Sequence, residues 1–206
     1  MKEIVVSNKE KLFKKIKYYK TFLYNRVEFV SNIADEEIDS DIEKNEIQGI
    51  IKALNIKNKG KRVEFIYDYL CEMLDNYYDG KNICEFCDNK CLAQQFEGST
   101  YKNGCCRLCK YQSSTGCTSA NLTCKLYYCE KVKSKNKTIE YKDLKMMKLF
   151  SLRQRLIIRN CFFSSREEML LDLKMGSIVL YAIRILFRVI RNLIYVRIKI
   201  KWATKM

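Results

Sequence analysis

Cysteine is the residue type in this sequence that is best placed to do chemistry, and it is concentrated in one segment. Nine of the eleven cysteines lie between positions 84 and 129, and the chain has no histidine. Two C-x2-C pairs, Cys84 with Cys87 and Cys106 with Cys109, are separated by 18 residues, an interval typical of four-cysteine zinc sites. Two intervening residues let both sulfurs of a tight turn face one metal ion at about 2.3 Å. We therefore predict that these four thiolates form a first metal site.

The other five cysteines of the segment supply ligands for a second candidate site. Four thiolates would complete a second tetrahedron and one sulfur would be left over, and the spacing also permits the two ligand sets to interleave. These five residues are Cys91, Cys105, Cys117, Cys124 and Cys129.

Zinc is the metal that the spacing favours, and two alternatives stay open. An iron–sulfur cluster also takes four thiolates, although the common C-x2-C-x2-C-x3-C-P run is absent. A disulfide framework is disfavoured because the start, MKEIVVSNKEKLFKKIKYYK, has no uninterrupted apolar stretch and no small-residue cleavage site. We therefore expect a cytoplasmic protein, either free or peripheral to the membrane, whose thiols are kept reduced.

The cysteine block also carries a resemblance. GCCRLCKYQSSTGC and NLTCKLYYC resemble the cysteine block of uncharacterised cysteine-rich proteins of low-GC bacteria, and the GCC and GC elements are similar to domains described as zinc- or iron-chelating. The resemblance covers about 50 residues. It implies metal binding, and it implies no particular reaction, because those families have none assigned.

The sequence offers no catalytic residues. Without histidine, His-based triads and His-based acid–base chemistry are excluded, and the chain contains neither GxGxxG nor a P-loop motif. A zinc ion closed by four thiolates has no open position for water, so its default role is structural. The sequence thus favours a metal-binding interaction or regulatory module over an enzyme.

Charge divides the chain into a neutral part and a basic part. Positions 131–206 hold 19 Lys and Arg against 5 Asp and Glu, a net charge of +14, whereas positions 1–130 carry a net charge of +1. This asymmetry favours an anionic partner, either nucleic acid or an acidic membrane surface. A protein partner or a homo-oligomer stays open, as does internal pairing with the acidic stretch ADEEIDSDIEKNE.

Arg184, Arg188 and Arg191 interrupt the apolar part of the C-terminal stretch GSIVLYAIRILFRVIRNLIYVRIKIKW. Each would cost about 2.5–3.5 kcal/mol near the centre of a bilayer, so we expect no transmembrane span. On a helix, Arg184, Arg188 and Arg191 line one stripe, and we predict that they project from the uncovered side as an anion-binding surface. The apolar face would pack on the N-terminal helices, on a second copy or on a membrane.

The periodicity predicts a mainly α fold in three parts. Positions 1–80 form N-terminal helices, 81–130 form an irregular Cys-rich metal-binding insert, and 131–206 form a basic helical part that packs on the N-terminal helices. Apolar spacing and capping residues predict helices over 8–31, from Ser40 to about Leu54, from about Val63 to Tyr78, and from Arg166 without interruption to about Ile200.

Overall fold

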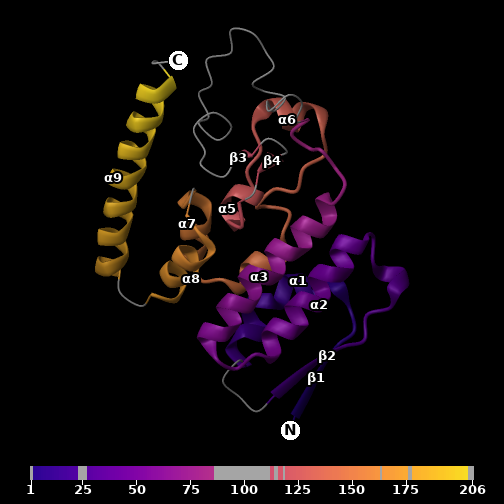
Figure 1. Ribbon diagram of the computed structural model, residues 1–206. Helices are drawn as coiled ribbons and strands as arrows, with labels where there is room; N and C mark the ends of the chain where they lie inside the picture. The colour runs from indigo at the N-terminus through magenta and orange to yellow at the C-terminus, as the bar shows by residue number, and fades with distance from the viewer. Residues whose placement is uncertain are drawn as a thin grey trace.

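The chain is mainly helical, as the sequence predicts (Figure 1). The computed structural model describes residues 2–22, 27–85, 112–113, 116–117, 119–162, 164–175 and 178–203. The elements in chain order are β1 (Lys2–Val6), α1 (Lys9–Tyr19), η1 (Lys20–Phe22), β2 (Val27–Ser31), η2 (Asp35–Glu37), α2 (Asp41–Asn55), α3 (Lys59–Tyr78), β3 (Gln112–Ser113), β4 (Gly116–Cys117), α5 (Leu122–Lys125), α6 (Glu130–Lys135), η3 (Lys145–Leu149), α7 (Leu152–Asn160), α8 (Arg166–Lys174) and α9 (Ile178–Ala203).

The N-terminal part is a strand–helix–strand unit, and the prediction of one helix over 8–31 is wrong. Strand β1 pairs in parallel with β2, and α1 makes the crossover that parallel neighbours require. Both strands are rich in β-branched residues, which favour a pleated, half-buried surface. The Asn55 side chain at the end of α2 accepts from the Phe29 amide and donates to the Phe29 carbonyl, each at 2.8 Å, and so extends the sheet beyond β2.

Helices α2 and α3 form the centre of the packed helical body, which is called the frame from here on. Ser40 caps α2, as predicted, by accepting from the amide of Glu43 at 3.4 Å. Asn58 caps α3 through the amide of Lys61 at 2.9 Å. The helices pack closely at Gly49, where an added Cβ would meet the Tyr69 ring at 2.3 Å. A larger residue at this contact would therefore require the ring to move.

A buried amide joins the returning chain to the frame. Asn121 is fully buried. Its side-chain Oδ1 accepts from the amides of Thr123 and Cys124. Its Nδ2 donates to the carbonyls of Cys161 and Ser164, both at 2.9 Å. Nearby, Tyr67 of α3 accepts from the Leu122 amide through its hydroxyl at 3.1 Å. These contacts fix α5 against α3 and hold the end of α7 beside the start of α8.

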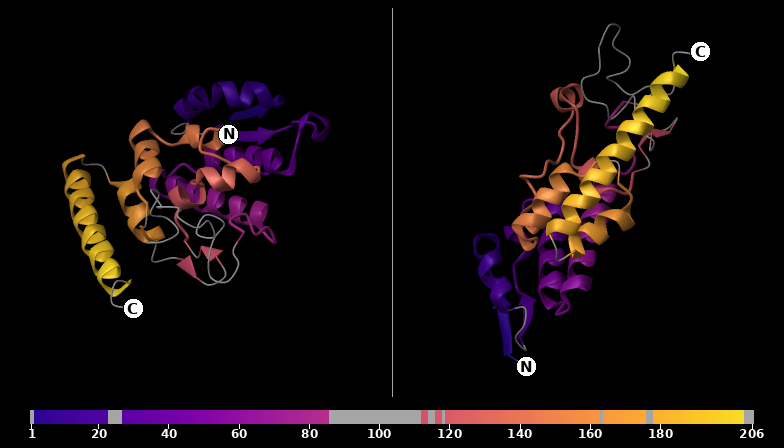
Figure 2. Two further views of the ribbon diagram at one scale, coloured as in Figure 1. Left: turned by 90° about the horizontal axis from the view of Figure 1, so that it is seen from above. Right: turned by 90° about the vertical axis from the view of Figure 1, so that its left-hand side faces the viewer.

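The segment after Ser165 contains two helices, although one continuous helix was predicted there. Ser165 begins α8 with a capping box to Glu168, as the sequence suggests, but α8 ends at Lys174 and α9 begins at Ile178. Figure 2 shows α9 at the edge of the molecule, with α7 and α8 between it and the N-terminal helices. Helix α8 packs against α3.

Glu46 of α2 is a buried acid in the core of the frame. Only 5% of its surface is exposed, and its carboxylate accepts from the Met146 amide at 2.5 Å. Burial raises the pKa of Glu46 to about 7, although the Met146 amide and Lys145 favour the charged form. Glu46 belongs to the acidic stretch ADEEIDSDIEKNE. Among the described residues, the acids of this stretch that form ion pairs are Asp35, Asp39 and Glu43. They pair with lysines of the N-terminal part and not with α9.

Glu46 makes the stability of the fold dependent on pH. The folded chain keeps a proton on Glu46 up to about pH 7, whereas the unfolded chain loses it near the ordinary value of 4.5. The folded state therefore binds more protons in this window, and the contribution of Glu46 to stability falls as pH rises through it. We expect Glu46→Gln, which retains an acceptor for the Met146 amide, to stabilise the protein by about 1–3 kcal/mol at pH 8.

Urea unfolding at pH 5 and pH 8 measures this effect. The difference between Glu46→Gln and the wild-type chain should be much smaller at pH 5, where Glu46 is neutral in the folded state. Glu36→Gln, at an exposed acid of η2, is the matched control and should change little at either pH. An equal effect of Glu46→Gln at both pH values would contradict the assignment.

Candidate functional site

The described residues include only part of the predicted metal-ligand sets. Of the first set, Cys84 is described, and Cys87, Cys106 and Cys109 lie outside the described residues. Of the second set, Cys124 and Cys129 are described with half-buried side chains, Cys117 is described only as backbone in β4, and Cys91 and Cys105 lie outside. Among the described residues, no group of three or more Cys, Asp or Glu side chains could hold a metal ion.

The margins of the Cys-rich segment lie side by side at the end of α3. Asn136, directly after α6, donates from Nδ2 to the Ile83 carbonyl at 3.1 Å, and Lys135 pairs with Glu85 at 3.4 Å. Tyr78, the last residue of α3, accepts from the Ile139 amide through its hydroxyl at 2.7 Å. The frame therefore brings the chain before and after the cysteines to one place.

A turn of unusual backbone conformation contains Cys84, the first residue of the first C-x2-C pair. The amide of Glu85 donates to the Asn82 carbonyl at 2.9 Å, and Glu85 has a φ of 47°. Few non-glycine residues adopt positive φ, and when they do the surroundings must hold them there. Here the Glu85 carboxylate contacts Lys135, the last residue of α6, and Asn136, which follows it. Contacts with the end of α6 therefore hold the turn next to Cys84.

Two cysteines lie away from this margin, in or beside the hydrophobic core. Cys161 is 4% exposed, and burial raises its pKa even though the Arg188 guanidinium nearby favours the thiolate. Cys71 packs at the edge of the core, where burial raises its pKa to about 12, and its thiol lies 3.9 Å from the Ala120 carbonyl. Burial therefore favours the protonated form of both thiols.

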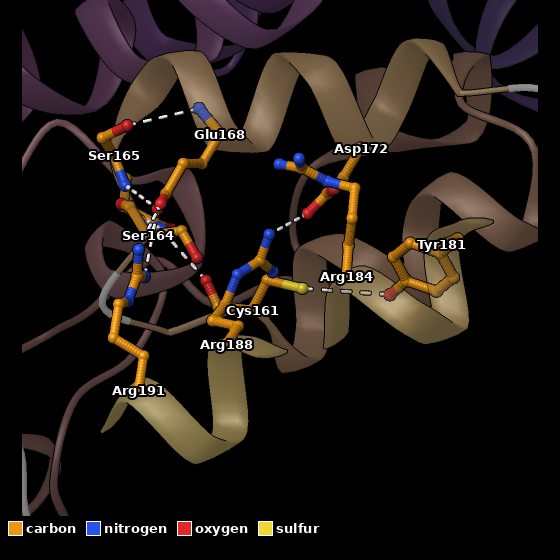
Figure 3. A network of polar contacts seen from close by, with 10 residues as sticks. Cys161, Ser164, Ser165, Glu168, Asp172, Tyr181, Arg184, Arg188 and Arg191 are labelled. Carbon is orange, nitrogen blue, oxygen red and sulfur yellow. Dashed lines mark hydrogen bonds and ion pairs between the residues drawn. The ribbon is translucent and has the colours of Figure 1, made fainter. Parts of the chain in front are cut away.

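The three predicted anion-binding arginines face the protein, which corrects the expectation that they project from the uncovered side (Figure 3). Arg184 donates from Nε to one oxygen of Asp172 at 2.7 Å, and Arg188 donates to the other oxygen. Arg191 donates to Glu168 at 2.5 Å and 3.4 Å. The arginine stripe of α9 is thus the face that packs on α8, and the carboxylates of α8 bind its guanidinium groups.

Burial makes this contact selective for charge. Asp172 is fully buried and Arg188 is 8% exposed, so each needs the other as a counter-charge in a region of low dielectric. Arg191 lowers the pKa of Glu168 to about 2, and the Ser165 amide acts in the same direction. Glu168 therefore stays ionised at neutral pH, and it holds α9 by charge-assisted hydrogen bonds.

Sequence reasoning missed Asp172 and Glu168 as partners of the arginines. A signal was present in the run Met169–Met175, where Asp172 and Lys174 are the only charged residues. An acid surrounded by leucines is rarely buried without a cation. Glu168 has a local role in the capping box of Ser165, and its contact with Arg191 depends on another helix. Each side chain performs its capping or packing role and also binds α9.

No helix in the described part of the chain has the length and apolar character needed to cross a membrane. Comparisons with protein-family models, with curated proteins and with solved structures found no match to this chain. The resemblance of the cysteine block to metal-chelating proteins therefore stays an expectation. The described residues define a helical frame that brings together the two ends of the Cys-rich segment near the end of α3 and that binds α9 through ion pairs.

Removal of the Asp172 charge should release α9. Asp172→Asn leaves the Arg188 guanidinium buried without a carboxylate, and breaking a buried ion pair costs about 3–5 kcal/mol. We expect faster hydrogen exchange at the amides of α9 and α8 and a lower free energy of unfolding. Glu10→Gln, which breaks the exposed pair with Lys14 on α1, is the control and should cost less than about 1 kcal/mol. Unchanged exchange in α9 would show that Asp172 does not hold it.

Proposed function

We propose that the chain is a metal-binding interaction module in which thiolates of the Cys-rich segment hold structural zinc. The observation that carries the proposal is the junction at the end of α3, where the Asn136 side chain binds the Ile83 carbonyl at 3.1 Å. It joins the two margins of a segment that holds nine cysteines. A metal-braced insert needs a frame that fixes both of its ends, and this contact provides one.

The cysteine spacing supports zinc as the metal. Cys84 and Cys87 would bind as one turn, and Cys106 and Cys109 as another, to give a four-thiolate tetrahedron. Such a site has a net charge of −2, and the sequence supplies nearby cations at Lys90, Lys102, Arg107 and Lys110. A second site would use four of the five remaining cysteines of the segment.

The turn at Glu85 supports Cys84 as a ligand. Its positive φ, at the residue directly after Cys84, is a conformation that costs free energy and is therefore expected where a specific geometry is needed. In a structural metal site, the binding free energy of the metal contributes directly to folding and offsets this cost. The role that follows is a rigid insert presented to a partner, with no catalytic step.

Metal analysis of anaerobically purified full-length protein tests the proposal. We expect zinc bound to the wild-type chain and no absorption in the visible range. Cys84→Ser should release one equivalent of zinc, because serine does not supply a thiolate. Cys71→Ser is the matched control and should keep the full metal content, since Cys71 is a half-buried thiol at the edge of the core.

The same measurements separate the alternatives. A brown, iron-containing protein would contradict the zinc assignment and would indicate an iron–sulfur cluster with a redox or sensor role. A protein that is purified without metal under these conditions, and that does not take up zinc when it is added, would contradict the proposal. Equal metal loss in Cys84→Ser and Cys71→Ser would remove the assignment of Cys84.

A further inference from the structure

Helix α9 presents a broad apolar face to solvent. Eight large hydrophobic side chains on it are between 44% and 66% exposed, with Phe187 the highest of them together with Val179. They recur at spacings of three and four residues and therefore share the face opposite the arginine stripe. The eight residues, called here the outer face, are Val179, Ile183, Leu186, Phe187, Val189, Ile190, Leu193 and Ile194.

The ion pairs with α8 cause this orientation. Asp172 and Glu168 bind the polar stripe of α9, so the apolar side must point away from the body. A soluble protein rarely exposes so large a contiguous apolar surface unless it binds something. The ion pairs therefore present the outer face to a partner.

The charge around the outer face identifies the kind of partner. From Leu173 to the last residue the chain has eight Lys and Arg and no Asp or Glu. Four of these cations, Lys174, Arg184, Arg188 and Arg191, have carboxylate partners on α3 or α8. The other four follow the outer face in the sequence, and the exposed Arg197 is three residues after Ile194 and therefore on the same side of the helix.

We propose that α9 docks flat on an anionic lipid bilayer, with the outer face in the headgroup–acyl boundary. Amphipathic helices with an apolar face and Lys and Arg beside it bind in this way, at a depth of about 5–10 Å. The C-terminal cations of α9 contact lipid phosphates. The rest of the protein stays in the water phase and is joined to α9 through α8. This inference does not depend on the metal content of the Cys-rich segment.

The charge pattern favours a membrane over a second copy of the chain. In a symmetric pair of outer faces, α9 would meet another α9, which has no carboxylate to offer Arg197 or the lysines that follow. An anionic bilayer supplies both an apolar layer and negative charge. A spanning arrangement is not needed, since no described helix is apolar enough to cross a membrane.

Sedimentation of the full-length protein with vesicles tests the proposal. We expect binding to phosphatidylglycerol–phosphatidylcholine vesicles, weak binding to pure phosphatidylcholine vesicles, and a loss of binding in high salt. The single tryptophan, Trp202, lies in the last turn of α9, and its fluorescence should shift to the blue with the anionic vesicles. Absence of binding to the anionic vesicles would overturn the proposal.

Substitutions on the outer face separate apolar insertion from simple charge attraction. Phe187→Gln does not change the net charge, and glutamine is a good helix former. Ile183→Gln/Phe187→Gln/Ile190→Gln removes three neighbouring apolar side chains of the outer face. We expect the triple variant to bind anionic vesicles at least about tenfold more weakly. Val5→Gln on β1, which changes a comparably exposed apolar residue, is the matched control and should bind like the wild-type chain.

A charge variant and the oligomeric state complete the test. Arg197→Gln/Lys199→Gln/Lys201→Gln should lose the preference for anionic over neutral vesicles. Wild-type affinity in the triple apolar variant, with far-UV circular dichroism showing an intact fold, would overturn the proposal. A wild-type dimer that dissociates on Phe187→Gln, together with no vesicle binding, would assign the outer face to a second copy instead.

Discussion

The buried carboxylate of Asp172 is the constraint on which the arrangement of the C-terminal part depends. A fully buried charge is tolerated only with a counter-charge and satisfied hydrogen bonds, and Arg184 and Arg188 supply both. Because these cations are on α9, the helix has one docking orientation on α8. Electrostatics, and not apolar packing, thus decides which side of α9 meets solvent, and the sequence pattern of the helix alone cannot reveal this.

Polar side chains make several of the long-range connections in the molecule. Asn121 satisfies four backbone groups at the start of α5, the end of α7 and the start of α8. Asn55 holds β2 through both backbone groups of Phe29, and Glu46 holds η3 through the Met146 amide. The contacts of Asn121 with Cys161 and Ser164, and those of Asn55 and Glu46, join segments far apart in sequence. These polar groups therefore specify the relative positions of elements that the apolar core stabilises.

Local signals in the sequence predicted part of this structure. The mainly α character, the cap at Ser40, the end of α3 near Tyr78 and the start of α8 after Ser165 are confirmed, since each depends on neighbouring residues. Strands β1 and β2 were missed because a five-residue strand gives a weak periodic signal and its partner lies about 25 residues away. The inward direction of the arginine stripe was missed for a similar reason, because it depends on acids of another helix.

The junction of Ile83 with Asn136 also bears on how such a chain can change during evolution. When the two margins of a segment are already joined, the frame does not rely on the segment for its own closure, and a change in loop length costs only a slowly rising entropy. Substitutions, insertions and deletions in the part of the segment before α5 then act on the segment without moving α3, α5 or α6. The end of α3 is therefore a natural insertion point, at which a helical frame can acquire or exchange a ligand-binding segment and keep its own fold.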